Sequence, residues 1–79
     1  MTVTARLRNC FAAVFPQVAV DRLEQASTAT LADWDSLATV RLVAVVEEEF
    51  EILLDVEELE ELDSFDRLQL LIERKLGAA

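Results

Sequence analysis

Residues 33–50 read Asp33-Trp34-Asp35-Ser36-Leu37-Ala38-Thr39-Val40-Arg41-Leu42-Val43-Ala44-Val45-Val46-Glu47-Glu48-Glu49-Phe50. Within this stretch Leu42, Val46 and Phe50 recur at every fourth position, which is the spacing of one face of a helix. Asp35 is a preferred N-cap residue, so a helix is expected to begin directly after it. The pattern predicts an amphipathic helix over residues 36–51 that buries its apolar face against other helices.

Leu37, Val40 and Ala44 fall together on a second face of this helix, turned away from the predicted core. The three glutamates at 47–49 stand near its C-terminal end, where the helix dipole disfavours negative charge. They are either a surface kept for a partner or an ordinary solvated face. The charge pattern alone favours neither interpretation.

The chain before this helix carries a helical pattern of its own. Residues 3–15 place apolar side chains at positions 3, 7, 10, 11 and 14, and Pro16 ends this helix because the residue before a proline is pushed out of helical geometry. Residues 16–35 form a long connection. Leu23 is expected to lie in a short helical turn of that connection, and Leu31 to hold it against the core.

The chain after this helix predicts two further helices. Residues 52–55 suit a short extended connection that ends in a capping aspartate, and a short third helix is expected over residues 56–62, with Leu59 facing inward. Asp63-Ser64 caps a fourth helix that ends at Gly77. The fold class is therefore all-α: a four-helix bundle with a long loop between helices 1 and 2 and a short third helix. The apolar stripe of the fourth helix consists of Phe65, Leu68, Leu71, Ile72 and Leu76.

The chain has 79 residues, which fits a single domain over residues 1–79 with a small core. It contains no histidine and no tyrosine, and Cys10 is its single cysteine. Ser-His-Asp and Cys-His catalysis and a Cys/His metal cage are therefore excluded within the chain, and we predict neither catalytic residues nor metal ligands. Cys10 lies between apolar neighbours at helical spacing, so we interpret it as part of the core rather than as a reactive thiol.

The formal net charge is −9, from 16 acidic and 7 basic residues. Such a chain repels nucleic acids and anionic membrane surfaces and favours basic protein partners. A hydrophobic content of 53% excludes an acidic disordered tail. The apolar run at 10–15 is shorter than a signal peptide or a membrane span requires. We therefore expect a monomeric cytoplasmic protein that binds neither nucleic acid nor membrane.

Ser36 is expected to present its hydroxyl to solvent in the first turn of the central helix. Unpaired backbone N–H groups and the positive end of the helix dipole favour a phosphate at this place. The simpler interpretation is that Asp35-Ser36 is only a capping pair, because both residue types are preferred at helix starts. The residues that follow favour the first interpretation.

Asp35-Ser36-Leu37, followed by Thr39-Val40, Leu42-Val43 and the run at 47–50, resembles the modification-site helix of acyl carrier proteins. The resemblance covers nearly the whole chain in its length, its helix order, its long first loop and the position of the serine. Residues 57–65 are similar to the third helix of that family and the start of its fourth.

The resemblance implies that Ser36 carries a covalent 4′-phosphopantetheine arm, with Asp35 as the helix cap beside it. The arm would hold acyl or aminoacyl intermediates as thioesters, so the chain would be a carrier rather than an enzyme. The implied partners are a phosphopantetheinyl transferase, an acyltransferase or an acyl or aminoacyl ligase, and ketosynthase-type enzymes with basic docking surfaces. The residues expected to contact these partners are Leu37, Val40, Arg41, Ala44, Glu47 and Glu48.

Several positions depart from the pattern of fatty-acid carriers. Asp33 and Trp34 stand where those carriers have a glycine and a small residue, and Arg41 stands where many have an acid. Ala38 and Ala44 replace more polar or larger residues. The altered face resembles that of dedicated, freestanding carriers of polyketide or related natural-product assembly, and Arg41 is expected to reject partners built for a wholly acidic helix. Trp34 has a second interpretation, as a side chain that packs the loop onto the bundle.

Two other classes of protein fit parts of the sequence. An acidic helical interaction module without covalent modification would dock a patch of Leu37, Val40 and Ala44 in a partner's groove, and this remains the alternative. A calcium-binding loop that begins at Asp33 fails, because its third ligand position is Leu37 and its glycine position is Ala38.

Overall fold

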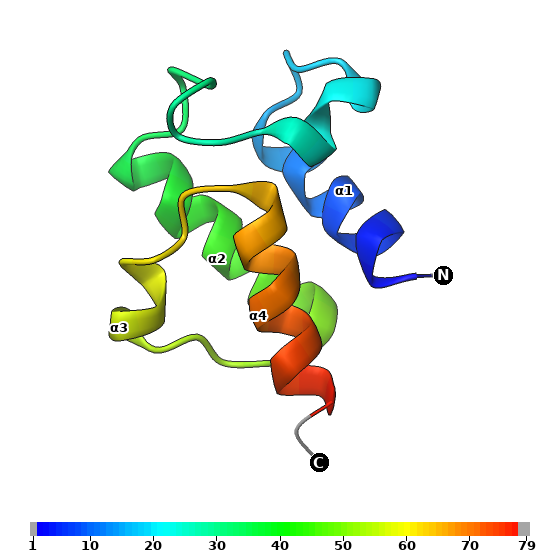
Figure 1. Ribbon diagram of the computed structural model, residues 1–79, viewed down its shortest axis with the longest axis vertical. Helices are drawn as coiled ribbons and strands as arrows, with labels where there is room; N and C mark the ends of the chain where they lie inside the picture. Colours follow the sequence, from blue (N-terminus) through cyan, green and yellow to red (C-terminus); the bar gives the residue numbers. More distant parts are fainter. Residues whose placement is uncertain (1, 78–79) are drawn as a thin grey trace.

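The computed structural model describes residues 2–77 as a small all-α domain (Figure 1). The elements are α1 (Val3–Val14), the 3-10 helix η1 (Val20–Gln25), α2 (Ser36–Phe50), α3 (Val56–Leu59) and α4 (Phe65–Gly77). α1 packs against α2 and α4, and η1 packs against α1 and α4. Figure 1 shows α3 at the periphery, between the connections that lead from α2 and into α4.

Local sequence decides where the helices begin. Thr2 caps α1 by accepting a hydrogen bond from the backbone N–H three residues on, at 3.1 Å. Ser64 caps α4 in the same way, with the backbone N–H of Arg67 donating to its hydroxyl at 3.1 Å. At α3 the Glu58 carboxylate accepts a hydrogen bond from the backbone N–H of the N-cap residue Asp55 at 2.8 Å. These bonds satisfy N–H groups that have no partner within the helix.

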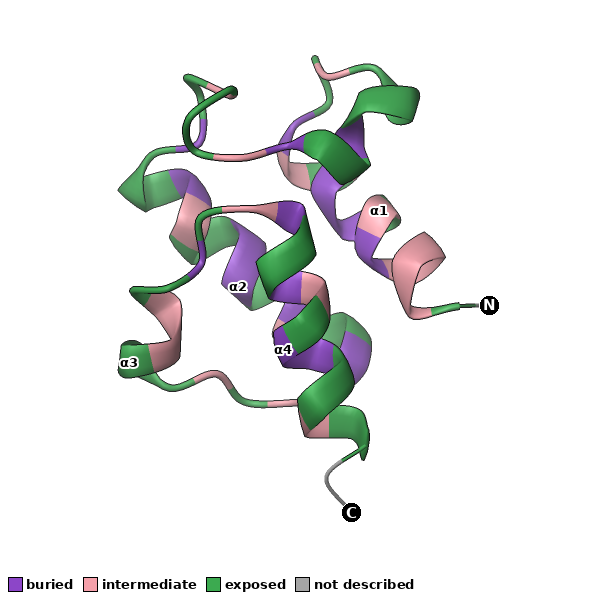
Figure 2. Cartoon of the chain, in the orientation of Figure 1, coloured by how far each residue is buried: buried purple, intermediate pink, exposed green. Residues whose placement is uncertain are grey.

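Phe11 lies at the centre of the core. Its ring centroid is 4.9 Å from that of Phe65, 5.4 Å from that of Trp34 and 6.0 Å from that of Phe15. Aromatic side chains from α1, the long connection and α4 therefore meet at one point, and each such pair contributes roughly 0.5–1.5 kcal/mol beyond its burial. Figure 2 shows the buried residues gathered along the inward faces of the helices. The predicted stripe residues confirmed as buried are Leu7, Cys10, Phe11, Leu42, Val46, Phe50, Phe65, Leu68, Leu71 and Ile72, whereas Val3 and Val14 are half-buried.

The long connection between α1 and α2 is held by burial and by backbone pairing. η1 buries Leu23 completely, which confirms the expected helical turn. Further on, the N–H of Thr28 donates to the carbonyl of Asp63 at 2.8 Å, and the N–H of Phe65 donates to the carbonyl of Ala26 at 2.9 Å. The connection is thus joined to the start of α4, and the second bond pairs backbone groups of two buried residues, Ala26 and Phe65.

Two helices end one residue earlier than predicted. α1 ends at Val14 rather than at residue 15, because Phe15 already has non-helical backbone angles before the proline (φ −122°, ψ 66°). α2 ends at Phe50 rather than at residue 51, because Glu51 adopts the left-handed conformation (φ 54°, ψ 47°) and closes the helix with its N–H on the carbonyl of Glu47.

Two predictions for the C-terminal part were wrong in extent. The third helix is shorter than residues 56–62, since only Val56–Leu59 is helical and the chain then turns. Leu76 is 42% exposed and does not belong to the core stripe, because the last turn of α4 extends past the buried cluster (Figure 2). Leu59 and Leu31 are half-buried against the core, as expected of residues that hold connecting segments in place.

Candidate functional site

Ser36 is the first residue of α2, and Asp35 is its N-cap. The Asp35 carboxylate accepts a hydrogen bond from the backbone N–H of Ala38 at 2.8 Å. Ser36 itself is exposed, and within residues 2–77 its hydroxyl has no hydrogen-bond partner. The expected cap and the expected exposure of the serine are therefore both present, at the positive end of the helix dipole.

The Asp-Ser pair occurs twice in the chain, and the two copies differ in structure. In Asp63-Ser64 the serine is the N-cap, is half-buried, and uses its hydroxyl to accept the N–H of Arg67. In Asp35-Ser36 the aspartate is the N-cap, so the serine stands one residue further into the helix and its hydroxyl has no capping role. Of the two pairs, Asp35-Ser36 is therefore the one that leaves its serine hydroxyl without a capping role at the helix start.

Trp34 fixes the chain directly before this site. Its side chain is only 4% exposed and lies edge-on to Phe11 at 5.4 Å. Its indole N–H donates to the Thr39 hydroxyl at 2.9 Å, and that hydroxyl donates to the carbonyl of Asp35 at 3.0 Å. The structure thus shows that Trp34 packs the loop onto the core, and the same contacts set the position of the first turn of α2.

The outward face of α2 carries the residues expected to meet a partner. Leu37 and Val40 are 63% and 62% exposed. Ala44, Arg41 and Glu48 are also exposed, and a helical projection places all five on one side of the helix. The predicted face is therefore present as a continuous stripe of apolar and charged side chains.

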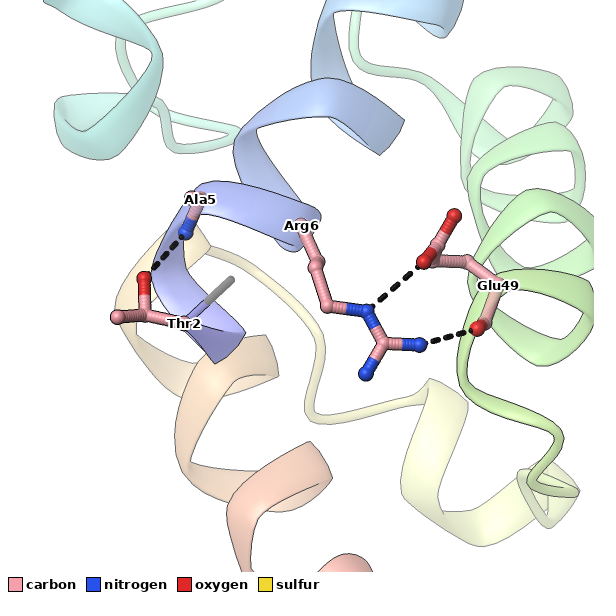
Figure 3. A network of polar contacts seen from close by, with 4 residues as sticks. All are labelled: Thr2, Ala5, Arg6 and Glu49. Atoms are coloured by element: carbon pink, nitrogen blue, oxygen red, sulfur yellow. Dashed lines mark hydrogen bonds and ion pairs between the residues drawn. The ribbon is translucent and has the colours of Figure 1, made fainter.

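The three glutamates at the end of α2 do not act alike, which the sequence did not reveal. Arg6 of α1 reaches Glu49, with its Nε 2.8 Å from the carboxylate and another guanidinium nitrogen 2.6 Å from the backbone carbonyl (Figure 3). The guanidinium also lies 4.5 Å from the centre of the Phe50 ring. Glu47 is half-buried and accepts the N–H of Leu54 at 2.9 Å. Arg6 thus offsets the unfavourable charge at this helix end.

Glu48 is consequently the one member of the trio without a partner among the described residues. Glu47 differs from its expected role as a freely exposed charge, because its carboxylate holds the connection that follows α2. The contact of Arg6 with Glu49 joins two distant parts of the chain, and Glu47 bonds the backbone of a loop. Neither contact could be predicted from a local pattern in the sequence.

An open cavity of about 230 Å³ lies between the long connection and the first turns of α2, and Ser36 is not part of its lining. It is lined by Gln17 of the long connection, by the acids Asp33 and Asp35, and by Leu37 and Arg41 of α2. The side-chain amide of Gln17 donates to the Asp33 carboxylate at 2.7 Å. Sequence reasoning singled out some of these residues separately, but nothing in their spacing showed that Gln17 and Arg41 share a cavity.

The start of α2 has the chemical character of an anion-binding helix end. An exposed hydroxyl at the start of a helix has free N–H groups and a positive dipole around it, which suits an attached phosphate. In the part of the chain that the structure describes, no cluster of three metal-binding side chains occurs. None of the helices over residues 2–77 has the length and apolar character needed to cross a membrane.

Comparison with known proteins gives no relative: no family model, no curated protein and no solved structure matches this chain.

Proposed function

We propose that this protein is a carrier that bears a 4′-phosphopantetheine arm on Ser36. The observation that carries the proposal is the contrast between the two Asp-Ser pairs. The Ser64 hydroxyl caps α4, whereas at α2 the Asp35 carboxylate is the cap and the Ser36 hydroxyl is exposed. The order of the helices and the long, well-anchored first connection also suit the acyl-carrier type of four-helix bundle.

The residues around Ser36 fit a phosphodiester. The backbone N–H groups of the first turn and the helix dipole favour negative charge at this point. Asp35 keeps its carboxylate on the N–H of Ala38, so it stabilises the helix without using the hydroxyl beside it. Trp34 holds the preceding loop on the core, so the serine stands on a fixed element.

The attachment is a group transfer that needs a partner enzyme. The Ser36 Oγ attacks the phosphorus of coenzyme A that bears the pantetheine, the pyrophosphate P–O bond breaks, and adenosine 3′,5′-bisphosphate leaves. The hydroxyl proton passes to a base of the transferase, since residues 2–77 offer Ser36 no such base within hydrogen-bonding distance. When bound, the arm supplies a thiol that holds an acyl group as a thioester.

The test is the intact mass of the protein after incubation with coenzyme A and a phosphopantetheinyl transferase. We expect a gain of one phosphopantetheine in the wild type, none in Ser36→Ala, and an undiminished gain in Ser64→Ala, which removes the other serine of an Asp-Ser pair. A wild-type mass that stays unchanged with several active transferases overturns the proposal.

The outward face of α2 is the proposed docking surface for the transferase, for an acyltransferase or ligase, and for ketosynthase-type enzymes of polyketide or related assembly in the cytoplasm. It begins at the modified serine and exposes Leu37 and Val40. Exposed charges around such a patch chiefly affect the encounter rate, so association with a basic partner should weaken as salt rises.

Glu48→Arg is the variant that tests this surface, because Glu48 is exposed and unpaired whereas Glu47 holds Leu54. We expect slower loading by the cognate enzyme at low salt, a smaller difference from wild type at high salt, and an unchanged melting temperature. Glu73→Arg on the exposed side of α4 makes the same change of charge elsewhere and should load normally. Equal loading rates for Glu48→Arg and wild type at low salt would contradict the docking surface.

The alternative function is an interaction module without covalent modification, which the exposure of Leu37 and Val40 also favours. The mass experiment separates the two functions. A module of this kind binds its partner equally well as wild type and as Ser36→Ala, and it gains no mass.

A further inference from the structure

The proposed function makes no use of a second open cavity, of about 810 Å³, within the long connection between α1 and α2. Every residue that lines this cavity falls between positions 17 and 31, so neither Ser36 nor α2 takes part. Figure 1 shows the connection at the end of the domain away from the C-terminus. The volume falls within the range of roughly 300–1,000 Å³ that is typical of pockets for small organic molecules.

The 3-10 helix η1 forms one wall of this cavity. In a 3-10 helix, side chains three positions apart lie on the same side. Ala19, Arg22 and Gln25 have this spacing, and all three line the cavity. Leu23, on another side of η1, is completely buried in the core. The contact that fixes η1 on the core therefore also sets Arg22 and Gln25 along the cavity wall.

The turn that follows η1 forms the facing wall and is held by hydrogen bonds. The carbonyl of Ala26 accepts the N–H of Phe65 at 2.9 Å, which ties the turn to α4. The hydroxyls of Ser27 and Thr30 lie 3.0 Å apart, and the N–H of Leu31 donates to the carbonyl of Ser27 at 2.9 Å. The cavity is therefore preformed, which lowers the ordering cost that a ligand meets on binding.

Arg22 and Gln25 are the free hydrogen-bonding side chains of this cavity. Neither has a side-chain partner among the described residues. The Gln17 amide, in contrast, donates to Asp33. A guanidinium offers a planar fork of donors that matches the two oxygens of a carboxylate, and the adjacent amide adds a further donor.

The charges around the cavity select a singly charged ligand. No carboxylate belongs to its described lining, and Arg22 is the one full charge there. Of the acids beside Arg22 in η1, Glu24 pairs with Arg8 at 2.9 Å, and Asp21 lies outside the lining. The chain as a whole carries a net charge of −9, which repels a dianion more strongly than a monoanion. A carboxylate therefore suits this site better than a phosphate.

The rest of the cavity surface is mainly apolar. Val18 and Leu31 are half-buried and pack against the core, Ala26 is buried, and Ala19 faces the same space. A ligand that fills the cavity must therefore carry an apolar body beside its charged group.

We propose that this cavity is a binding site for a small amphipathic monocarboxylate, with its carboxylate on Arg22 and Gln25 and its apolar body against Val18 and Leu31. The site is independent of the proposed carrier function, because no residue of α2 lines it.

The experiment titrates unmodified protein with 4-phenylbutyrate, an aromatic monocarboxylate. Two control ligands each lack one part: 4-phenyl-1-butanol lacks the charge, and acetate lacks the apolar body. The measurements are the NMR shifts of the Arg22 Nε–H, the Gln25 side-chain amide and the methyl groups of Val18 and Leu31. We expect saturable shifts at these groups with a dissociation constant on the order of 1 mM, and acetate binding at least about tenfold weaker.

The variants are Arg22→Gln, Arg22→Lys and Arg74→Gln. Arg74 is the matched control, because it is also exposed and has no ion-pair partner among the described residues, but it lines a cavity between α3 and α4. Arg22→Gln should weaken 4-phenylbutyrate about 3–5-fold and leave 4-phenyl-1-butanol unchanged. Arg22→Lys should fall between wild type and Arg22→Gln, since it keeps the charge but loses the fork. Arg74→Gln should bind as wild type does.

The melting temperatures of the variants without ligand should equal that of wild type, so that a change in affinity reports the site and not the fold. Three results would overturn the site: no saturable shift at the Val18 and Leu31 methyl groups, equal affinities of wild type and Arg22→Gln for 4-phenylbutyrate, or the same loss of affinity in Arg74→Gln as in Arg22→Gln.

Discussion

Glu51 closes α2 with a backbone conformation that suits glycine. Its φ of 54° makes it the one non-glycine residue with positive φ among residues 2–77. The left-handed region brings Cβ close to a carbonyl oxygen, which costs roughly 1–2 kcal/mol for a residue with a side chain. A carboxylate at this place also meets the negative end of the helix dipole. The residue therefore combines an unfavourable conformation with an unfavourable charge.

Glu51→Gly should raise the free energy of unfolding by about 0.5–1 kcal/mol or more, because glycine adopts this conformation without steric cost and removes the charge. Urea unfolding at pH 7 measures the change. Glu51→Gln removes only the charge and separates the two causes. The conformational explanation fails if Glu51→Gly is no more stable than Glu51→Gln.

The choice of N-cap residue explains why Ser36 is a candidate site and Ser64 is not. Asp35-Ser36 and Asp63-Ser64 differ by one position in their relation to the helix start. That shift decides whether the hydroxyl caps the helix or remains exposed. The dipeptide alone does not show which of its two residues caps the helix, since aspartate and serine are both preferred N-cap residues.

At the scale of elements, α3 is the part of the fold with the least burial. It has four residues, Val56–Leu59, and none of them is fully buried. Its position depends on polar contacts: Glu58 accepts the N–H of Asp55 at 2.8 Å and pairs with Lys75 of α4 at 2.9 Å. The backbone N–H of Asp55 and then Lys75 lower the pKa of Glu58 below its ordinary value of 4.5.

The stability that Glu58 provides should therefore depend on pH. Because its pKa is lower in the folded than in the unfolded protein, the contribution is fully present above about pH 4.5 and is lost as the pH falls through the folded-state value. Melting temperatures of wild type and Glu58→Gln should differ at pH 7 and converge at the acid end. Glu57→Gln, on the exposed side of α3, is the control and should not reproduce this pH dependence.

The helices were the part of the fold that the sequence could predict. The stripes of α1, α2 and α4 place apolar residues at helical spacing, and Asp35 and Ser64 cap their helices as expected. Leu76 was wrongly included, because periodicity continues past the point where a neighbouring helix is present to cover it. A helical repeat of apolar residues predicts which face of a helix is apolar, but it does not predict where the neighbouring helix that covers this face ends.

The contacts between elements could not be predicted in this way. Arg6 pairs with Glu49 across 43 positions, and the backbone of Ala26 meets that of Phe65. Such pairings depend on how the chain folds back on itself, and they leave no periodic signal. The same limit applied to the candidate site: the sequence predicted the Asp35 cap, the exposure of Ser36 and the outward face of α2, but not the cavity that Gln17 and Arg41 line together.

For the molecule as a whole, Cys10 is a probe of global unfolding. Burial, and secondly the negative charge of Glu49, raise the pKa of its thiol from 9.0 to about 11, whereas Arg6 acts in the opposite direction. The side chain is 3% exposed in the core cluster. Because the thiolate is the reactive form, about one thiol in a thousand is reactive at pH 8 even before access is considered.

Alkylation of Cys10 at pH 8 should therefore be at least about 100-fold slower in the native protein than in urea, and its rate should follow the population of unfolded molecules. Mass spectrometry of iodoacetamide-treated samples measures it. In the control the cysteine is moved to the surface of α1 by combining Cys10→Ala with Ala13→Cys, and labelling should be fast without denaturant. Fast labelling of native wild type would show that the core opens locally.

Trp34 gives the molecule an optical signal at the candidate site. It is the only tryptophan in a chain without tyrosine, so ultraviolet emission excited through the indole comes from one place, two residues before Ser36. While the ring lies against Phe11 and Phe15, its emission is that of an indole shielded from water. Any event that lifts the loop moves the indole into water and shifts the emission to longer wavelength. The native emission thus reports displacement of this loop in real time, with no dye and no engineered residue.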